Sequence, residues 1–335
     1  MLNQLRSLNH AMPILTGFFW GSVAFAMSPL NLPLGLFLGT MAAFLTYLEL
    51  VTQWSFRAPS KRKEPIHDEE WEKEMVGVDA GVISTYHRAG IAGEPTLVLI
   101  HGWTSGSIRM TSRAQQFIDR DWSVVLIDLP SHGASSPLKK WSAEQSSTLV
   151  INALNTLHKR HRAMFDGDVY FYGHSIGGFH CLRFSKRRSE LQFGDQLSGW
   201  ILESPMTGYS EIFDETCNIL RIPHILRPIV LRKTIRHFNA INGPERMITE
   251  LTDADTPQWG IPQEPTLLVQ AYPDDRLGST HHERLVRVMK ESNLSNMLTE
   301  EYLTDLQHSG SAICLSRDQA INRWIEKAQN HSSSD

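Results

Sequence analysis

The chain of 335 residues contains few cysteines, no excess of positive charge and no cofactor motif. Its three cysteines, Cys181, Cys217 and Cys314, lie far apart and form no C-x-x-C pair, so we expect no disulfide framework. Charged residues make up 20% and the net charge is −4, which gives no indication of a nucleic-acid partner. The sequence also lacks an internal repeat, a dinucleotide-binding fingerprint and a spaced set of metal ligands. We therefore expect neither a cofactor nor a metal.

Charge is also scarce in one long stretch near the N-terminus. Between residues 11 and 51 the only charged side chain is Glu49. This apolar run is too long for a signal peptide and about twice as long as a membrane-spanning helix. The segment Ser28–Pro33 interrupts it, so we predict a transmembrane hairpin with helices over 12–29 and 34–53. A buried hairpin inside a soluble domain is the alternative. Small residues would let the helices approach closely: Gly17, Gly21, Gly35 and Gly39.

Basic residues flank the predicted hairpin, whereas its short loop carries no charge. These residues are Arg6 before it and Arg57, Lys61, Arg62 and Lys63 after it. By the positive-inside rule, both ends of the hairpin and the rest of the chain face the cytoplasm, at an inner or plasma membrane. The predicted organisation is a hairpin (1–57), a polar linker (58–73), a globular domain (74–330) with an insertion (206–262), and a disordered tail (331–335).

After the linker, short apolar runs alternate with segments of helical pattern. Thr96–Ile100 and Ser123–Ile127 are continuous apolar runs, as expected of strands buried on both faces of a sheet. The alternation predicts an α/β fold, in which a mostly parallel sheet carries helices on both faces. The predicted strands are 74–78, 82–87, 96–100, 123–127, 169–172, 197–202, 265–271 and 297–306, and the predicted helices are 107–119, 143–164, the segment from Gly178 on, 281–291 and 317–329.

The segment Gly173–Gly177 has the sequence Gly-His-Ser-Ile-Gly and lies between a predicted strand and a predicted helix. This is the setting of a G-x-S-x-G nucleophile elbow, a sharp turn that exposes a serine. The glycines relieve clashes in the turn, and the helix N-terminus stabilises negative charge near Ser175. The five-residue pattern also occurs by chance, so its meaning depends on the other parts of the site appearing in order.

Those other parts are present. The segments His101–Trp103, Asp128–Ser135 and Gly173–Gly178 resemble three landmarks of the α/β-hydrolase superfamily, in the same order, and the resemblance extends over about residues 75–330. It implies the α/β-hydrolase fold and a serine hydrolase of the esterase or lipase kind, with Ser175 as the nucleophile. The serine argues against dehalogenases and epoxide hydrolases of the superfamily, which need an aspartate at this position.

The superfamily order of nucleophile, acid and histidine implies the other two members of a triad. A serine hydroxyl needs an adjacent base, and His308 follows a predicted strand and opens a loop of small residues. The acid is expected after the preceding strand, where Asp274 fits the superfamily pattern better than its neighbour Asp275. We interpret His281 and His282 as solvated residues at a helix start.

The oxyanion hole of the superfamily uses two backbone N–H groups. By resemblance they belong to Ile176, directly after the nucleophile, and to Trp103. His101 is interpreted as a brace for the loop of Trp103, and Asp128 as a hydrogen-bond acceptor for the turn that follows it. Glu203 remains a weaker candidate for the triad acid, because some hydrolases place an acid after this strand.

The insertion over 206–262 occupies the position of a cap or lid in the superfamily. Its centre, Arg221–Phe238, mixes apolar residues with five cations. It either lies on anionic lipid or packs over the substrate pocket with a solvated basic face. The whole sequence predicts a membrane-anchored serine hydrolase that cleaves a small-molecule ester or thioester, with lipid-like acyl substrates favoured. A serine peptidase, an acyltransferase and a non-catalytic membrane scaffold are the alternatives.

Overall fold

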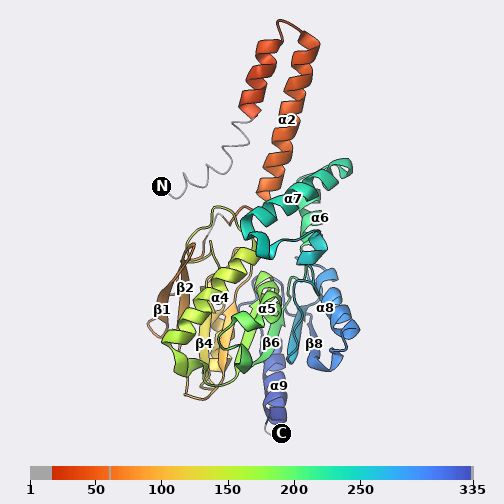
Figure 1. Cartoon of the computed structure of the whole chain (residues 1–335). Helices are drawn as coiled ribbons and strands as arrows, with labels where there is room; N and C mark the ends of the chain where they lie inside the picture. Colours follow the sequence, from red (N-terminus) through yellow and green to blue (C-terminus); the bar gives the residue numbers. More distant parts are fainter. Residues whose placement is uncertain (1–16, 60–61, 333–335) are drawn as a thin grey trace. The chain divides into compact units, whose positions relative to one another are not determined.

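The computed structural model describes residues 17–59 and 62–332, which form two compact units (Figure 1). The helical unit consists of the residues up to Ala58 together with Leu138–Ser142 and Ser210–Leu251. The sheet unit consists of Pro59–Pro137, Ala143–Tyr209 and the residues from Thr252 on. The predicted residues 12–16 of the first apolar helix, and the flanking Arg6 and Lys61, lie outside the described residues.

One eight-stranded sheet forms the centre of the sheet unit, in the order β1-β2-β4-β3-β5-β6-β7-β8. The antiparallel pairs are β1–β2 and β2–β4, and all other neighbours are parallel. The strands are β1 Glu72–Val78, β2 Gly81–Arg88, β3 Thr96–Ile100, β4 Ser123–Ile127, β5 Val169–His174, β6 Leu197–Glu203, β7 Thr266–Ala271 and β8 Leu298–Leu303. The predicted mostly parallel sheet of an α/β-hydrolase fold is therefore confirmed.

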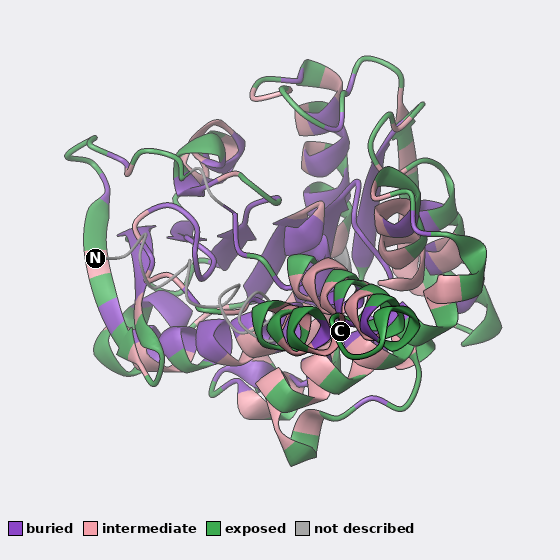
Figure 2. Cartoon of the chain, turned by 90° about the horizontal axis from the view of Figure 1, so that it is seen from above, coloured by how far each residue is buried: buried purple, intermediate pink, exposed green. Residues whose placement is uncertain are grey.

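Helices cover both faces of this sheet. Successive side chains of a strand point to opposite faces, so each central strand packs against helices on both sides. Tyr170 and Tyr172 pack in a core cluster with side chains of α3 and α9. The intervening Phe171 points the other way and lies 5.5 Å, between ring centroids, from Phe184 of α5. Figure 2 shows the central strands as almost wholly buried. The helices of this unit are α3 Thr111–Ile118, α4 Ala143–Arg160, α5 Ile176–Lys186, α8 Thr280–Glu291 and α9 Leu315–Ser332.

The strands β3 and β4 have the predicted bounds, whereas several helices differ from the prediction. The helix predicted over 143–164 ends at Arg160 and continues as a short 3-10 helix over Arg162–Phe165. The helix α5 begins at Ile176, directly after the serine of the elbow. The last helix, α9, extends to Ser332, so the prediction of a disordered tail from residue 331 is wrong for its first two residues. Residues 333–335 lie outside the described part.

The helical unit contains two antiparallel apolar helices joined by a turn. They are Gly17–Met27 and α2, Leu32–Trp54, whose N-terminus is capped by the side chain of Asn31. At two places they approach so closely that a Cβ would clash: a Cβ on Gly17 would lie 2.5 Å from the Thr46 hydroxyl, and one on Gly35 would lie 2.9 Å from the Ser28 Cα. Of the described helices, only α2 is long and apolar enough to cross a membrane.

The base of α2 packs against the inserted helices α6, Ser210–Ile219, and α7, Arg227–Asn242. Leu48 of α2 shares a buried cluster with Cys217, Ile222 and Val230. Apolar residues at the centre of the insertion therefore contact the N-terminal helix, so they do not all face lipid or a substrate pocket.

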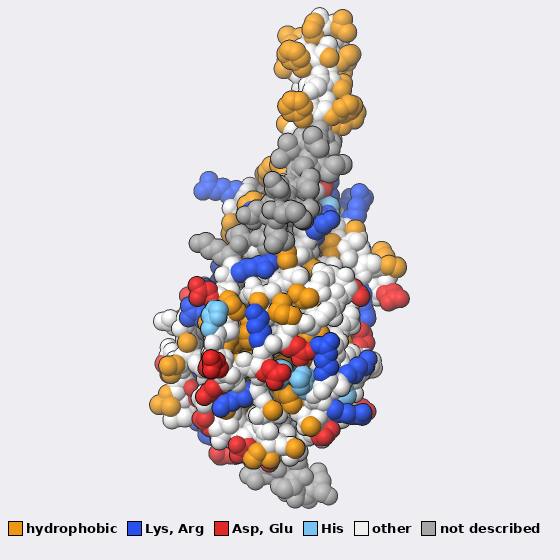
Figure 3. Space-filling model, turned by 90° about the vertical axis from the view of Figure 1, so that its left-hand side faces the viewer, with side chains coloured by type: hydrophobic (Ala, Val, Ile, Leu, Met, Phe, Trp, Pro, Cys, Tyr) orange, Lys and Arg blue, Asp and Glu red, His pale blue; other side chains and the backbone are white. Residues whose placement is uncertain are grey.

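The only charged residue of the apolar run, Glu49, contacts side chains of α7 near this buried cluster. The Glu49 carboxylate accepts a hydrogen bond from Lys233 Nζ at 2.7 Å and lies 2.9 Å from His237 Nε2. Both partners belong to α7. Away from this contact, groups of hydrophobic side chains project from the hairpin near its turn (Figure 3), where Phe25 and Leu30 are about four-fifths exposed.

Candidate active site

The backbone at Ser175 forms a strained turn between β5 and α5. Ser175 has φ 55° and ψ −118°, a conformation that non-glycine residues rarely adopt. The surrounding glycines are required by close packing. A Cβ on Gly173 would lie 2.5 Å from the Gly177 backbone, a Cβ on Gly178 would lie 2.6 Å from Pro205, and a Cβ on Gly177 would collide with the backbone of β3. The sequence Gly-His-Ser-Ile-Gly therefore folds as the sharp turn between a strand and a helix that the sequence predicts.

Three of the predicted site residues meet at the carboxyl ends of the strands. The Ser175 hydroxyl lies 3.0 Å from Nε2 of His308, and Nδ1 of His308 lies 2.8 Å from Oδ2 of Asp274. The side chains of His308 and Asp274 are 2% and 1% exposed, so bulk water does not compete for their contact. Because a carboxylate only accepts, Nδ1 of His308 carries the proton and Nε2 is free to accept one from the serine.

Asp274 is held rigidly by its own turn. Its Oδ1 accepts hydrogen bonds from the backbone N–H groups of Arg276 and Leu277, at 2.9 and 2.8 Å. Burial alone would raise the pKa of Asp274, but the hydrogen bonds from His308 and these backbone groups hold that pKa below its ordinary value. The carboxylate is therefore charged at neutral pH. The neighbouring Asp275 is exposed.

The loop after β3 passes directly beside Ser175. A Cβ on Gly102 would lie 3.4 Å from the Cβ of Ser175, so the backbone that leads to Trp103 runs along the elbow. Ile176 opens α5 on the other side of Ser175. His101 braces this loop, because its Nε2 accepts a hydrogen bond from the backbone N–H of Leu129 at 3.0 Å. The two expected oxyanion donors therefore belong to segments that flank the serine.

Asp128 connects two loops near the site. Its carboxylate accepts backbone hydrogen bonds from Ser107 at 2.8 Å and from Ala134 at 2.9 Å. The Asp128 carboxylate therefore accepts hydrogen bonds from backbone N–H groups, including one in the turn that follows it, as the sequence predicts.

A cavity of about 530 Å³ opens onto Ser175 and His308 within the sheet unit. Its wall includes the basic side chains of Lys63, Arg109 and Arg276, and none of its lining residues is Asp or Glu. Arg113 also lines it, but that guanidinium is engaged in the ion pair described below. The other lining residues are Gly102, Trp103, Thr104, Ser105, Met110, His174, Ser309, Gly310, Ser311 and Ala312.

Glu203 lies behind the elbow, with its carboxylate 1% exposed. Its backbone carbonyl accepts a hydrogen bond from the N–H of Ser175 at 3.0 Å, and its carboxylate is paired with Arg113 at 2.8 and 2.5 Å. It also accepts from the Tyr172 hydroxyl and lies 3.8 Å from Arg317. Burial opposes the charged carboxylate, but Arg113 holds the pKa of Glu203 far below its ordinary value. Glu203 thus has its own partners, and the structure places it against Arg113 and not against His308.

Arg317 links this ion pair to the loop of His308. Its guanidinium donates to the backbone carbonyls of Ser311 and Ala312, at 3.0 and 3.3 Å. On the other side, Nε2 of His174 donates to the backbone carbonyl of His308 at 2.9 Å. Burial lowers the pKa of His174 to about 4, so this imidazole is neutral. The sequence does not indicate these contacts of Arg317 and His174, because nothing in the neighbouring residues distinguishes a buried side chain from a solvated one.

The interpretation of His281 and His282 as solvated residues is wrong. Both are buried, and Nδ1 of His281 accepts a hydrogen bond from the backbone N–H of Thr207 at 3.0 Å. They lie at the start of α8 on the side that faces the protein, so their role is packing and backbone satisfaction.

Comparison with known proteins agrees with this architecture. Residues 93–250 match the model of a family described as serine aminopeptidase, S33. An esterase from Pyrococcus furiosus superposes with a TM-score of 0.57 at 13% identity, covering 82% of this chain and 97% of that chain. Alpha/beta hydrolase domain-containing protein 10 from mouse superposes with a TM-score of 0.56 at 11% identity, covering 76% and 99%. The chain therefore has the α/β-hydrolase fold, and nearly half of its residues match the model of a serine-hydrolase family.

The Glu203 ion pair leads to a prediction about stability. Glu203→Gln leaves Arg113 buried without its counter-charge, so we expect the free energy of unfolding to fall by about 3–5 kcal/mol in urea titrations. Glu70→Gln, which removes an exposed partner of Arg88, is the matched control and is expected to change it by less than about 1 kcal/mol.

The pH dependence of this effect has a definite sign. The pKa of Glu203 is lower in the folded than in the unfolded chain, where it is about 4.3. Its stabilisation is therefore fully present above that pH and is lost as the pH falls towards the folded pKa. The difference between the wild type and Glu203→Gln should shrink below about pH 4. An equal stability of the two proteins at pH 7 would contradict this account.

Proposed function

We propose that the chain is a membrane-anchored serine hydrolase that cleaves carboxylic esters or thioesters through Ser175, His308 and Asp274. The observation that carries this proposal is the continuous hydrogen-bonded chain from the Ser175 hydroxyl through His308 to Asp274. His308 takes the hydroxyl proton as the serine oxygen attacks the acyl carbon, and Asp274 stabilises the imidazolium that forms. The developing oxyanion is placed to accept from the backbone N–H groups of Ile176 and Trp103.

The second half of the reaction uses the same residues. His308 returns its proton to the leaving alcohol or thiol, which departs as the acyl group stays bonded to the Ser175 oxygen. A water molecule then gives its proton to His308 and attacks the acyl carbon, and the serine recovers its proton as the acid is released. Transfer of the acyl group to another acceptor, in place of water, would make the enzyme an acyltransferase.

The charges around the cavity favour one class of substrate. Lys63, Arg109 and Arg276 line the same cavity as Ser175, and none of the lining residues is Asp or Glu. An aminopeptidase must accommodate the positive α-amino group of its substrate, which this wall would repel. Anionic acyl substrates, such as esters that carry a carboxylate or a phosphate, are favoured instead. This is our reason for preferring an esterase over the peptidase alternative.

Membrane attachment is proposed for the hairpin. The 23 residues of α2 extend over about 35 Å, which is sufficient for the hydrocarbon core of a bilayer. Large apolar side chains along the hairpin are exposed, and its one charged residue, Glu49, is paired near the end of α2. Trp54 lies at that end with Arg57 above its ring, 5.0 Å away, a pairing suited to a membrane interface. The basic residues that follow favour a cytoplasmic sheet unit.

The triad assignment is tested by substitution in the full-length protein. Ser175→Ala should abolish labelling by a fluorophosphonate probe and hydrolysis of a small ester, because the covalent step is lost. Asp274→Asn should lower kcat on the order of 10⁴-fold, since His308 loses its orienting partner, whereas the control Asp275→Asn should change it little. Retained labelling of the Ser175→Ala variant, with unchanged unfolding, would refute the proposed function and favour the scaffold alternative.

The charge preference is tested with matched esters that differ only in a distal group. We expect kcat/KM to follow the order anionic, neutral, cationic, with differences that decrease at high salt. Arg109→Gln and Lys63→Gln should each lower kcat/KM for the anionic ester about 5-fold and leave the neutral ester unchanged, since one exposed contact contributes about 1 kcal/mol. Arg287→Gln, on the exposed side of α8, is the control. Faster turnover of the cationic ester would contradict the preference.

Membrane attachment is tested by alkaline carbonate extraction and by C-terminal reporters. The full chain should stay in the membrane pellet, with a green fluorescent protein fusion active and an alkaline phosphatase fusion inactive. Leu45→Lys places a charge on the exposed middle of α2 and should reduce the integrated fraction, because it costs about 3 kcal/mol of insertion free energy. Met75→Lys, exposed on β1, is the control. Complete extraction of the wild type would contradict anchoring, and an active phosphatase would contradict the orientation.

A further inference from the structure

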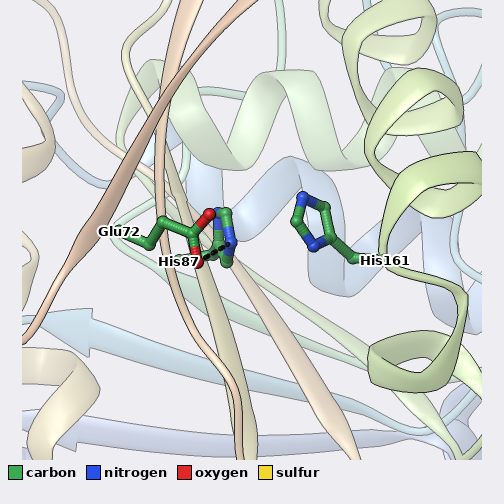
Figure 4. A group of neighbouring side chains, drawn as sticks. All are labelled: Glu72, His87 and His161. Atoms are coloured by element: carbon green, nitrogen blue, oxygen red, sulfur yellow. Dashed lines mark ion pairs between the residues drawn. The ribbon is translucent and has the colours of Figure 1, made fainter.

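Two histidines and a glutamate meet at the edge of the sheet, on elements that the proposed reaction does not use. Glu72 begins β1, His87 lies opposite it in β2, and His161 follows the last residue of α4. One ligand atom from each lies within 4.8 Å of the other two. Figure 4 shows the two imidazoles facing each other, with the carboxylate beside His87. The strands β4 and β3 lie between β2, which carries His87, and β5, which leads to Ser175.

His87 is buried without satisfying its polar atoms. It is 3% exposed, and within the described part of the chain neither of its ring nitrogens makes a hydrogen bond. Its Nε2 lies 3.3 Å from Oε2 of Glu72, a contact that is an ion pair only when the imidazole is protonated. An imidazole left in this state costs free energy, because its water contacts are lost and not replaced. A ligand between Nε2 and the carboxylate would remove that cost.

His161 has the hydrogen bond that a metal-binding histidine needs. Its Nε2 donates to Oε2 of Glu74 at 2.9 Å, which leaves Nδ1 to bind an ion. A carboxylate that orients the far side of a ligating imidazole is the usual support of a metal site.

We propose that Glu72, His87 and His161 bind one divalent transition-metal ion, with Zn²⁺ as the best match, and that Glu74 positions His161. Two imidazoles and one carboxylate form a ligand set that suits Zn²⁺, with water in the fourth position. Tetrahedral Zn²⁺ requires ligand atoms about 3.4 Å apart. The contact between His87 and Glu72 already has this length, and His161 reaches it by a shift on the order of 1 Å.

The consequence of binding is a link between the edge hairpin and α4. The strand β1 lies at the edge of the sheet, and β2 is the one strand that pairs with it. An ion shared by β1, β2 and the residue after α4 would fasten this edge to the helix that covers it. Binding to the folded state alone raises the unfolding temperature with metal concentration.

The experiment uses the untagged full-length protein, treated with a chelator, dialysed and titrated with Zn²⁺ in a calorimeter. We expect one Zn²⁺ per chain, and a rise in unfolding temperature at saturation. Glu72→Gln and His161→Gln should each weaken Zn²⁺ binding by at least about 10-fold, and Glu74→Gln by about 10-fold through the orientation of His161. Co²⁺ in place of Zn²⁺ should give the visible absorption of a tetrahedral site, which these substitutions remove.

Two controls separate this site from other metal-binding groups. Glu70→Gln and His67→Gln remove an exposed carboxylate and an exposed imidazole in the same unit, and both should leave Zn²⁺ affinity unchanged. Glu72 is itself largely exposed, so Glu72→Gln does not threaten the fold. A stoichiometry far below one, or wild-type affinity in both Glu72→Gln and His161→Gln, would overturn the proposal.

Discussion

The site depends on the close packing of the turn at Ser175 between β3 and β6. Gly177 presses against the backbone of β3, and the N–H of Ser175 donates to the carbonyl of Glu203 at the end of β6. Both contacts involve backbone atoms, whose positions the sheet fixes. The backbone of Ser175 is therefore fixed relative to the sheet, and its contact with His308 depends on where the loop of His308 lies.

That placement depends on a buried ion pair. Glu203 and Arg113 are both withdrawn from water, which is costly unless each remains partnered. Tyr172 and Arg317 complete the set, and Arg317 also holds the carbonyls of the loop after His308. The same group of charges thus connects the turn at Ser175, the helix α3 and the loop that carries His308. A rigid polar network of this kind keeps reacting groups in register without a contribution from substrate.

The helical unit contains a charged residue, Glu49, within an apolar helix. A carboxylate in an apolar helix is expensive, and Glu49 is tolerated because α7 supplies Lys233 and His237 at hydrogen-bond distance. The inserted segment thereby joins the N-terminal hairpin in one unit and also contributes the apolar partners of Leu48. The insertion therefore packs against the N-terminal hairpin. The part that belongs to the helical unit is Ser210–Leu251, which is shorter than the predicted insertion over 206–262.

The sequence by itself determined the α/β order of elements, the elbow and the candidate positions of Ser175, Asp274 and His308. These follow from local patterns, since hydrophobic period, glycine spacing and order along the chain need no knowledge of distant partners. Only the tertiary structure decided which charges are paired. Glu203 is buried with Arg113, His281 is buried against Thr207, and Glu72, His87 and His161 meet from three separate segments. Strand register and helix packing bring such residues together, and the free energy of a charged group depends on those neighbours, which its own stretch of sequence does not contain.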